Sequence, residues 1–203
     1  MAVSKEQTAA PSRDQSDFRR RLLDGLALSI REVGLQRTQI NDIVRNARTS
    51  NRTFYECFPN KNACFEELIE QWSRDIHDAV RVALDETAPW DEQVDQTVDA
   101  YLEILSEKPE LTVTLTRQMP ALGVRGAELE AEDIDRYVAL VMEVSRNESA
   151  RRAGVEPVDR ETAAMLIGGF AEILDRANRE GRSPTSIGPT VKKVIKRAIG
   201  PAG

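Results

Sequence analysis

Three closely spaced helical patterns between Phe18 and Phe65 constrain the fold of this chain more than any other feature. In the first, apolar residues recur every three or four positions, as on one face of an α-helix, until Gly34 interrupts the pattern. The second follows Thr38 and the third follows Ser50, and both residue types favour the start of a helix. Helices this short are stable only when they pack on one another. The first apolar stripe is Phe18, Leu22, Leu26, Ile30 and Val33, and the second is Ile40, Ile43, Val44 and Ala47.

The third pattern, from Asn51 to Cys57, is unusual for a core helix. Phe54 and Phe58 fall on one side, and the other side is polar. A helix-turn-helix has this organisation, because the N-terminal side chains of its second helix lie on base edges in the major groove of DNA. The sequence therefore predicts a DNA-binding surface. The polar side consists of Asn51, Arg52, Thr53 and Tyr55.

The same stretch resembles the DNA-binding domain of the TetR family of transcriptional repressors. In that family a Gly, a Thr pair, Ile-Ala, Ala-Gly-Val-Ser, Thr-Phe-Tyr, Phe and Lys follow in order. Three positions depart from the pattern: Gln39 replaces the second Thr, Arg48 takes the turn position of the Gly, and Arg52 lies where small residues are common. Arg48 either adopts a left-handed conformation, which is uncommon outside glycine, or the turn has another form. The matching residues are Gly34, Thr38, Ile43, Ala47, Ser50, Thr53, Phe54, Tyr55, Phe58 and Lys61.

Individual side chains of this segment suggest different contacts with DNA. The resemblance implies that the Tyr55 hydroxyl binds a phosphate. Lys61 would begin the next helix, where the helix dipole disfavours a cation unless an anion such as a DNA phosphate is near. Arg52 suits guanine and Asn51 suits adenine in the major groove, with a merely solvated surface as the alternative. The expected DNA-binding residues are Thr38, Gln39, Arg48, Ser50, Asn51, Arg52, Thr53, Tyr55 and Lys61.

Charge is distributed unevenly along the chain. The formal net charge is -6, but residues 1–61 hold 11 Lys and Arg against 7 Asp and Glu, so this segment carries +4 and the remainder -10. A basic segment on an acidic body suits a DNA-binding domain, although charged proteins also show such differences by chance. The run Arg19–Arg21 could follow the DNA backbone, but a charged run on a helix is more often a solvated face.

Several classes of function lack the residues that they require. No apolar run approaches the roughly 20 residues needed to cross a bilayer, and Met1–Asp17 lacks the apolar core of a signal peptide. We therefore expect a cytoplasmic protein with no membrane contact. Cys57 and Cys64 are expected to be buried thiols rather than a disulfide, a redox sensor or metal ligands, and His77 is the only histidine. No catalytic triad, metal-ligand spacing or phosphate-binding loop is present, so we expect neither an enzyme nor a cofactor.

Beyond Asn60 the sequence predicts helices only, beginning with a long one over about 62–84. Gly168 and Gly169 would each weaken the next-to-last helix by about 1 kcal/mol relative to Ala, which suggests that close approach of another helix compensates. In the TetR family the last two helices commonly form a four-helix dimer interface, so the resemblance implies a homodimer. The candidate interface residues are Leu166, Gly169, Phe170, Ile173, Val191, Val194 and Ile195.

A site for a small-molecule effector is expected in this helical body. Its candidate lining residues come from several helices, and any of them could belong to the core instead. They are Trp72, His77, Tyr101, Arg117, Met119, Tyr137, Met142 and Met165.

We therefore predict an all-α chain with a disordered leader (1–16), a helix-turn-helix DNA-binding domain of three helices (17–61), and a helical effector-binding and dimerisation domain (62–203). The predicted function is a transcriptional regulator, a repressor that binds a palindromic DNA operator as a homodimer and is released by a small molecule. Effector binding would move the helix over 62–84 and change the separation of the two DNA-binding helices. The alternatives are a helical scaffold for protein partners without specific DNA binding and, from another class, a helical hydrolase.

Overall fold

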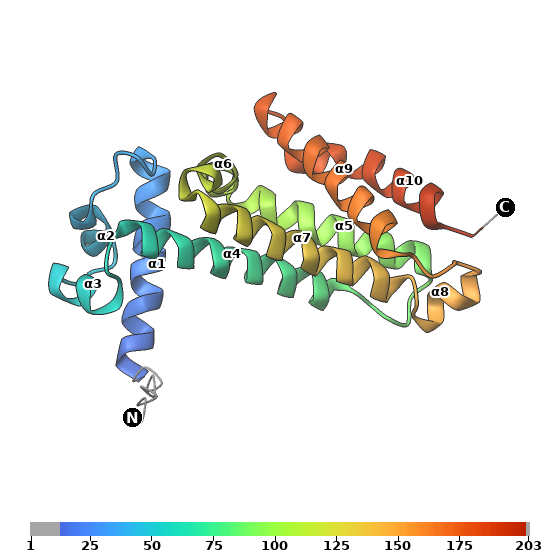
Figure 1. Ribbon diagram of the computed structural model, residues 1–203, viewed down its shortest axis with the longest axis horizontal. Coiled ribbons are helices and arrows are strands. Elements are labelled where there is room, and N and C mark those ends of the chain that lie inside the picture. The colour runs from blue at the N-terminus through green and yellow to red at the C-terminus, as the bar shows by residue number, and fades with distance from the viewer. Residues whose placement is uncertain (1–12, 202–203) are drawn as a thin grey trace, which may run out of the picture. The chain divides into compact units, whose positions relative to one another are not determined.

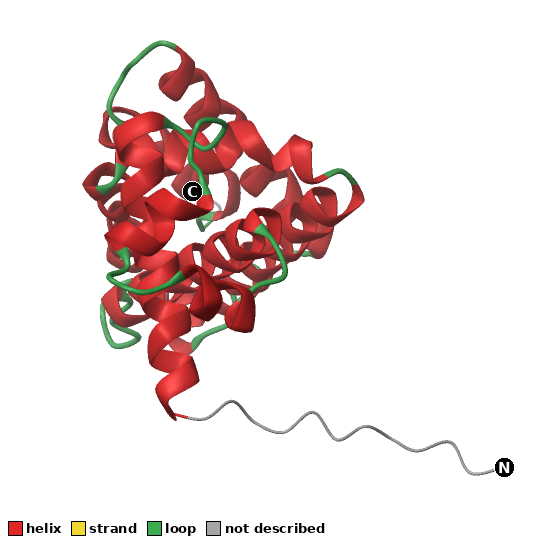
Figure 2. Ribbon diagram, turned by 90° about the vertical axis from the view of Figure 1, so that its left-hand side faces the viewer, coloured by secondary structure: helices red, strands yellow, loops and turns green. Residues whose placement is uncertain are grey.

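The computed structural model describes residues 13–201, and this part of the chain contains helices and no β-strand (Figure 1, Figure 2). The prediction of an all-α fold is therefore confirmed. The chain divides into two compact units, one ending at Leu68 and the other beginning at Ile69. The helices are α1 (Arg13–Val33), α2 (Ile40–Asn46), α3 (Asn51–Cys57), α4 (Lys61–Ala83), α5 (Trp90–Glu107), α6 (Pro109–Gln118), α7 (Val124–Val144), α8 (Glu148–Ala153), α9 (Arg160–Arg179) and α10 (Gly188–Ile199), with 3-10 turns at Met119–Leu122 and Pro184–Ile187.

The N-terminal unit is built on close packing between α1, α2 and α3. The apolar face of α1 is buried where the periodicity predicts it. Gly25 lies where α1 meets α2: a Cβ atom there would come within 2.6 Å of the carbonyl oxygen of Ile43 and 2.9 Å of the backbone nitrogen of Ala47. A larger residue would push the two helices apart, since a packed core does not absorb extra volume. The buried side chains of this core include Leu22, Leu26, Ile30, Ile43, Phe54, Phe58, Cys64 and Phe65.

Specific residues set the ends of the first three helices. α1 stops before Gly34, whose φ of 78° is left-handed and costs glycine little. Gln39, not Thr38, is the N-cap of α2, so the prediction that Thr38 caps this helix was wrong. The buried Thr38 hydroxyl instead donates to the carbonyl oxygen of Gly34 at 2.9 Å. Ser50 caps α3 as predicted, because its hydroxyl accepts a hydrogen bond from the backbone N–H of Thr53 at 3.1 Å.

The C-terminal unit contains the rest of α4 together with α5 to α10. Contacts between α4 and α7 advance along both helices in the same direction: Glu70 binds Arg125 at 2.6 Å, and Arg81 binds Glu143 at 2.7 Å. The two helices therefore run parallel, side by side (Figure 1). α9 packs on α7, where Ala163 is fully buried, and α10 packs on α5.

Two segments differ from the sequence prediction. The short helix α8 was not predicted; the Asn147 side chain caps its start, and Gly154, with a φ of 77°, ends it. Of the leader expected over 1–16, residues 1–12 lie outside the described residues, and the other four form the first turn of α1. Within residues 13–201, no helix is both long and apolar enough to span a bilayer.

Candidate DNA-binding surface and ligand cavity

The outer side of α3 presents a compact polar surface. Asn51, Tyr55 and Arg52 lie within about 100° of one another around the helix axis, and all three are exposed. The Tyr55 ring keeps 60% of its surface exposed while packing edge-on against the buried Phe54, with ring centroids 5.5 Å apart. Phe54 and Cys57 hold the opposite side of the helix in the core. The apolar side of this short helix is thus packed in the core, and its polar side faces solvent.

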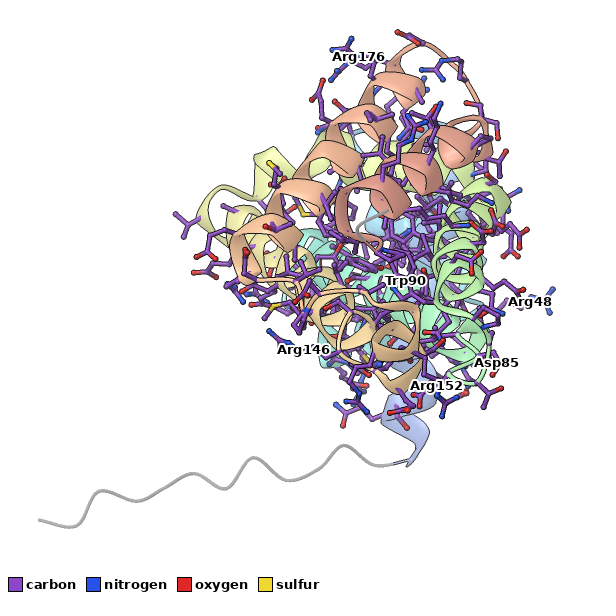
Figure 3. The ribbon with its side chains drawn as sticks, turned by 90° about the vertical axis from the view of Figure 1, so that its right-hand side faces the viewer. Arg48, Asp85, Trp90, Arg146, Arg152 and Arg176 are labelled. Atoms are coloured by element: carbon purple, nitrogen blue, oxygen red, sulfur yellow. The ribbon has the colours of Figure 1, made fainter. Side chains whose placement is uncertain are left out.

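Arg48 is left-handed, with a φ of 51°, and is the only described non-glycine residue with a positive φ. The N–H of Thr49 bonds to the carbonyl of Val44 at 2.9 Å and the N–H of Arg48 to that of Arg45 at 3.1 Å, which is the Schellman arrangement that usually has glycine at this position. The turn of the motif therefore keeps its ordinary form with an arginine in it. The Arg48 side chain is exposed and extends into solvent (Figure 3).

Arg21 holds this turn in place from α1. Its guanidinium donates to the carbonyl oxygen of Ala47 at 2.7 and 3.1 Å and to that of Arg48 at 2.5 Å. These carbonyls close α2, where the helix dipole favours a cation. Arg21 therefore binds the backbone of the motif, whereas the neighbouring Arg20 is exposed and, among the described residues, forms an ion pair only with Asp17.

Arg19 has the corresponding role at the end of α3. Its guanidinium donates to the carbonyl oxygen of Cys57 at 2.7 Å, forms an ion pair with Glu67 and lies 4.5 Å from the ring centroid of Phe58. The hydrogen bond to Glu67 raises the pKa of Arg19 above its usual value. Two arginines of the run Arg19–Arg21 thus bind the protein itself, which the sequence interpretation of a solvated face missed.

Lys61 and Thr38 are placed differently from the expectation of direct phosphate contact. The Lys61 ammonium donates to the carbonyl oxygens of Leu35 and Thr38, both at 2.9 Å, in the loop between α1 and α2. These carbonyls supply the negative partner that a cation at the first turn of α4 requires, a role that the sequence interpretation assigned to DNA. The Thr38 side chain is fully buried and has no surface to offer to a phosphate.

The candidate base-reading residues also have partners within the motif. The exposed Arg52 pairs with Glu56 one turn later at 2.9 Å, and the Asn51 amide donates to the Asn41 side chain at 2.9 Å. Such exposed contacts are weak and exchange readily for DNA. Glu56 places a carboxylate beside the polar surface, a feature that the sequence interpretation did not weigh.

Of the remaining expected DNA-binding residues, Ser50 and Thr53 lie at the start of α3 and Gln39 lies at the start of α2. Gln39 and Ser50 are exposed, and Thr53 is half-buried with its hydroxyl 2.9 Å from that of Ser50.

Burial raises the pKa of the two nearby cysteines, Cys57 and Cys64, so both remain protonated thiols near neutral pH.

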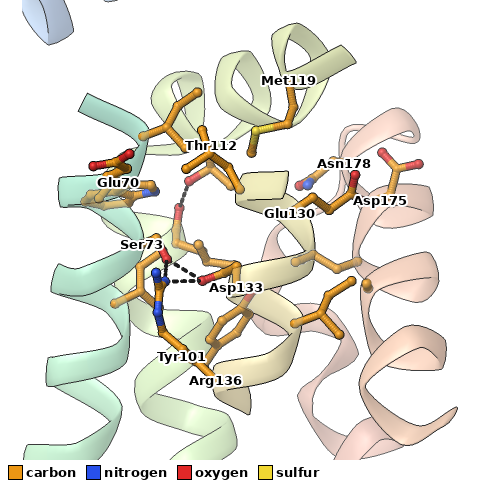
Figure 4. A pocket seen from close by; sticks show the side chains of 18 residues that line it. Glu70, Ser73, Tyr101, Thr112, Met119, Glu130, Asp133, Arg136, Asp175 and Asn178 are labelled. Carbon is orange, nitrogen blue, oxygen red and sulfur yellow. Dashed lines mark hydrogen bonds and ion pairs between the residues drawn. The ribbon is translucent and has the colours of Figure 1, made fainter. Parts of the chain in front are cut away.

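A cavity of about 280 Å³ lies within the C-terminal unit, with walls from α4, α5, α6, α7 and α9 (Figure 4). Its size is close to the lower end of the roughly 300–1,000 Å³ typical of small-molecule sites. Aliphatic and aromatic side chains form most of the wall, and polar groups converge on it from α4, α7 and α9. The polar lining residues on these three helices are Glu70, Ser73, Glu130, Asp133, Arg136, Asp175 and Asn178, and α6 adds Thr112.

Three of the eight residues expected to line the ligand site do line this cavity. Trp72 and Tyr101 contribute aromatic surface, and Met119 contributes a thioether. The polar lining was missed, although Glu130, Asp133 and Arg136 recur every three residues beside the apolar stripe of α7. That spacing was the available signal, because residues three apart lie on one side of a helix.

The other five expected residues do not line the cavity. Met165 is 70% exposed on the outer face of α9, and Arg117 is also exposed. Met142 packs against the small core around Val138, Val158 and Ala163. His77 and Tyr137 pack ring to ring, with centroids 6.0 Å apart; Tyr137 is buried and His77 is half-buried.

The cavity contains a short polar network centred on Asp133. Its carboxylate accepts a hydrogen bond from the Ser73 hydroxyl and lies 3.3 Å from the Arg136 guanidinium, which also donates to Ser73 at 2.5 Å. Burial raises the pKa of Asp133, and the hydrogen bond from Ser73 and the charge of Arg136 oppose that effect. The network joins α4 to α7 at the cavity wall.

One face of α9 and α10 has no partner within the described chain. Met165 and Val194 are exposed apolar side chains, and a Cβ atom at Gly168 or Gly169 would meet nothing within 4 Å. Among the expected interface residues, Val191 instead packs inside its own unit, where it keeps 4% of its surface exposed. Leu166, Phe170, Ile173 and Ile195 are half-buried.

The N-terminal unit contains a segment that matches a known protein family. Residues 22–68, from α1 into α4, match the family model for bacterial regulatory proteins of the tetR family. Over 151 residues the chain is 18% identical to YhgD of Bacillus subtilis (strain 168), described as an uncharacterized HTH-type transcriptional regulator. That alignment covers 74% of this chain and 78% of the relative.

Solved structures share the fold over most of the chain. The regulator FadR of Bacillus subtilis in complex with stearoyl-CoA is 16% identical with a TM-score of 0.72, and covers 89% of this chain and 98% of its own. A protein of Saccharomonospora viridis in complex with choline is 21% identical with a TM-score of 0.71, over 92% of this chain and all of its own. Likeness at this identity establishes the fold alone.

Proposed function

We propose that this chain, which belongs to the tetR family of bacterial regulatory proteins, represses transcription as a homodimer that binds a palindromic operator and is released by a small molecule. The family makes the chain a DNA-binding transcriptional regulator with a helix-turn-helix. The observation that carries the proposal is the exposed polar arc of α3, formed by Asn51, Arg52 and Tyr55 on a helix whose other side is core. A helix so displayed fits the major groove.

The contacts with DNA divide by side-chain chemistry. Arg52 and Asn51 read base edges, because their donors match guanine and adenine. Tyr55 and Arg48 bind phosphates at the edges of the groove, assisted by Gln39, Ser50 and Thr53 near the start of α3. Lys61 supports the surface by holding the loop before α2, and only its third N–H remains for a phosphate. Thr38 acts through the core alone.

The unpartnered face of α9 and α10 supports the proposed dimer. Exposed Met165 and Val194, together with the open space at Gly168 and Gly169, suit close approach of the same face of a second copy. Glycine in a helix is otherwise destabilising. A twofold dimer reads two half-sites about 34 Å apart or a near multiple, which requires an inverted repeat in the operator.

Regulation is proposed to pass through α4. Phe65 and Leu68 of this helix are buried in the N-terminal unit, while Trp72 and Ser73 line the cavity. A ligand that prefers one geometry of α4 shifts the population of DNA-binding states by its difference in affinity for them. The ligands of the two solved relatives support a small-molecule effector, and they differ too much from each other to define its class.

The test is selection of duplex DNA from a random library by the purified protein at about 150 mM salt, where non-specific binding is weak. We expect enrichment of an inverted repeat, and Arg52→Ala should relax the preference at one position of each half-site. Arg152→Ala, an exposed arginine on α8, serves as the matched control and should leave the selected sequence unchanged. An unenriched pool would instead support a helical scaffold for protein partners.

A further inference from the structure

The charges around the cavity select among classes of ligand. Four carboxylates line it against a single guanidinium, that of Arg136. This guanidinium is already occupied, because it donates to the Ser73 hydroxyl at 2.5 Å and lies 3.3 Å from Asp133. An anionic ligand would therefore meet no available cation in the wall. The four carboxylates are those of Glu70, Glu130, Asp133 and Asp175.

Cations behind the wall pair with two of these carboxylates, but most are shared with other acids. Arg179 pairs with both Asp175 and Glu172, and Glu70 pairs with Arg74 at 3.8 Å and with Arg125. Arg125 lies 2.6 Å from Glu70, 3.3 Å from Glu128 and 3.5 Å from Glu132, so one guanidinium is shared among three acids. Glu130 has neither a hydrogen-bond partner nor an ion-pair partner among the described side chains. Figure 4 shows its carboxylate directed from α7 toward α9. Glu130 is therefore the carboxylate of the wall that remains available to pair with a ligand.

Aromatic surface in the same wall suits a cation as well. Trp72 and Tyr101 both line the cavity, and the Lys108 ammonium, 4.9 Å from the centroid of the Trp72 ring, already takes one position over that ring. Trp is the side chain whose ring attracts cations most strongly. The rest of the wall is aliphatic, so the ligand needs an apolar body in addition to its charge. These aliphatic residues include Ile69, Ile76, Leu105, Leu129, Ile134 and Leu174.

We propose that the cavity binds an organic cation, an amine or quaternary ammonium compound with an apolar body, and that the unpartnered Glu130 holds its charge, assisted by Asp133. Burial raises the pKa of Asp133, and a cation bound beside this carboxylate opposes that rise because it favours the ionised form. The assignment of this compound as the effector rests on the proposed regulatory function, whereas the charge preference of the cavity does not.

The experiment compares three probes with one apolar body: 4-phenylbutylamine, 4-phenylbutan-1-ol and 4-phenylbutanoate. Binding to the full-length protein without DNA is measured by calorimetry and by Trp fluorescence. We expect the amine to bind at least tenfold more tightly than the alcohol, and the carboxylate to bind more weakly than either. Equal or tighter binding of the alcohol or the carboxylate, or no binding of the amine, would overturn the proposal.

Two variants locate the charge. Glu130→Gln alters an exposed, unpartnered side chain, so we expect the fold to be retained. The substitution should lower the affinity for the amine severalfold and leave the affinity for the alcohol within about twofold of its original value. Asp133→Asn should act in the same direction. Glu103→Gln, on the exposed side of α5, is the control and should change neither affinity. An unchanged amine affinity in Glu130→Gln and Asp133→Asn would contradict the assignment.

A separate measurement distinguishes this proposal from the regulatory one. The affinity for the selected operator is measured with and without saturating amine. Selective amine binding with unchanged DNA affinity removes the effector role and keeps the charge preference. If 4-phenylbutanoate instead releases the DNA, regulation by a ligand is retained and the proposal of a cationic ligand is overturned.

Discussion

Arg21 of α1 donates two hydrogen bonds to the carbonyl oxygen of Ala47, at 2.7 and 3.1 Å, where α2 ends. This guanidinium therefore stabilises the turn of the motif and is not available to bind DNA. Arg19 does the same at the end of α3 through the carbonyl oxygen of Cys57. The basic character of the N-terminal segment is therefore partly structural, and the side chains that remain for DNA are fewer than its charge indicates.

Arg21→Ala should lower the free energy of unfolding of the N-terminal unit by about 1–3 kcal/mol, because the carbonyls of Ala47 and Arg48 lose their charged donor. Urea denaturation measures the loss. Arg20→Ala removes the neighbouring arginine, whose only described ion pair is the exposed one with Asp17, and should cost less than about 0.5 kcal/mol. Equal losses in the two variants would mean that Arg21 does not stabilise the turn.

Arg48→Gly should stabilise the protein. The left-handed conformation costs a residue with a Cβ about 1–2 kcal/mol, which glycine avoids. The greater freedom of glycine in the unfolded state opposes this gain by about 0.5–1 kcal/mol, so the net stabilisation should be at most about 1.5 kcal/mol. Arg48→Ala is the control, because it removes the same charge but keeps the strain. Both variants should reduce the salt dependence of DNA binding equally. The idea fails if Gly is no more stable than Ala.

Val194→Asp should weaken self-association by roughly tenfold or more, since it places an unpaired charge on the proposed interface of α9 and α10. Val194 is 48% exposed in the single chain, so the protomer itself should remain folded. Val82→Asp introduces the same charge at a valine of α4 that is 88% exposed, and should leave the dimer intact. Sedimentation over a range of concentrations compares the two, and dimers of equal strength would count against this interface.

Asp159 should make the stability of α9 dependent on pH. Hydrogen bonds from the backbone N–H and the hydroxyl of Thr162 lower the pKa of this N-cap carboxylate. A lowered folded-state pKa contributes stability above the unfolded value of about 3.9, and this contribution is lost as the pH falls through the folded value. Asp159→Ala should therefore lower Tm at pH 7, and the difference from the natural protein should shrink below about pH 4.

Asp159→Asn provides the control for this prediction. Its amide oxygen still accepts from the Thr162 backbone, so the cap persists without the charge. Tm should fall less than in Asp159→Ala, and the difference in Tm between the Asn and Ala variants should be independent of pH, because neither side chain titrates. A penalty in Asp159→Ala that stays constant from pH 7 to pH 3 would show that the charge of the cap contributes nothing.

The all-α fold and the bounds of α3 were predictable from the sequence because they depend on local features. Ser50 caps the helix within its own turn, and Phe54 sets its buried side by periodicity alone. The left-handed Arg48 was one of two conformations that the sequence left open. Each of these features involves residues a few positions apart, whose relative placement follows from helix geometry.

The hydrogen-bond partners of Arg19, Arg21 and Lys61 could not be predicted from local sequence features. Their partners are 23 to 48 positions away in the chain, so only packing of α1 and α4 against the motif decides which carbonyls they reach. The same applies to the cavity: Trp72 lines it and His77 does not, although both lie on α4. Periodicity assigns a residue to a side of a helix, whereas the neighbouring helix that covers this side is chosen by the tertiary fold.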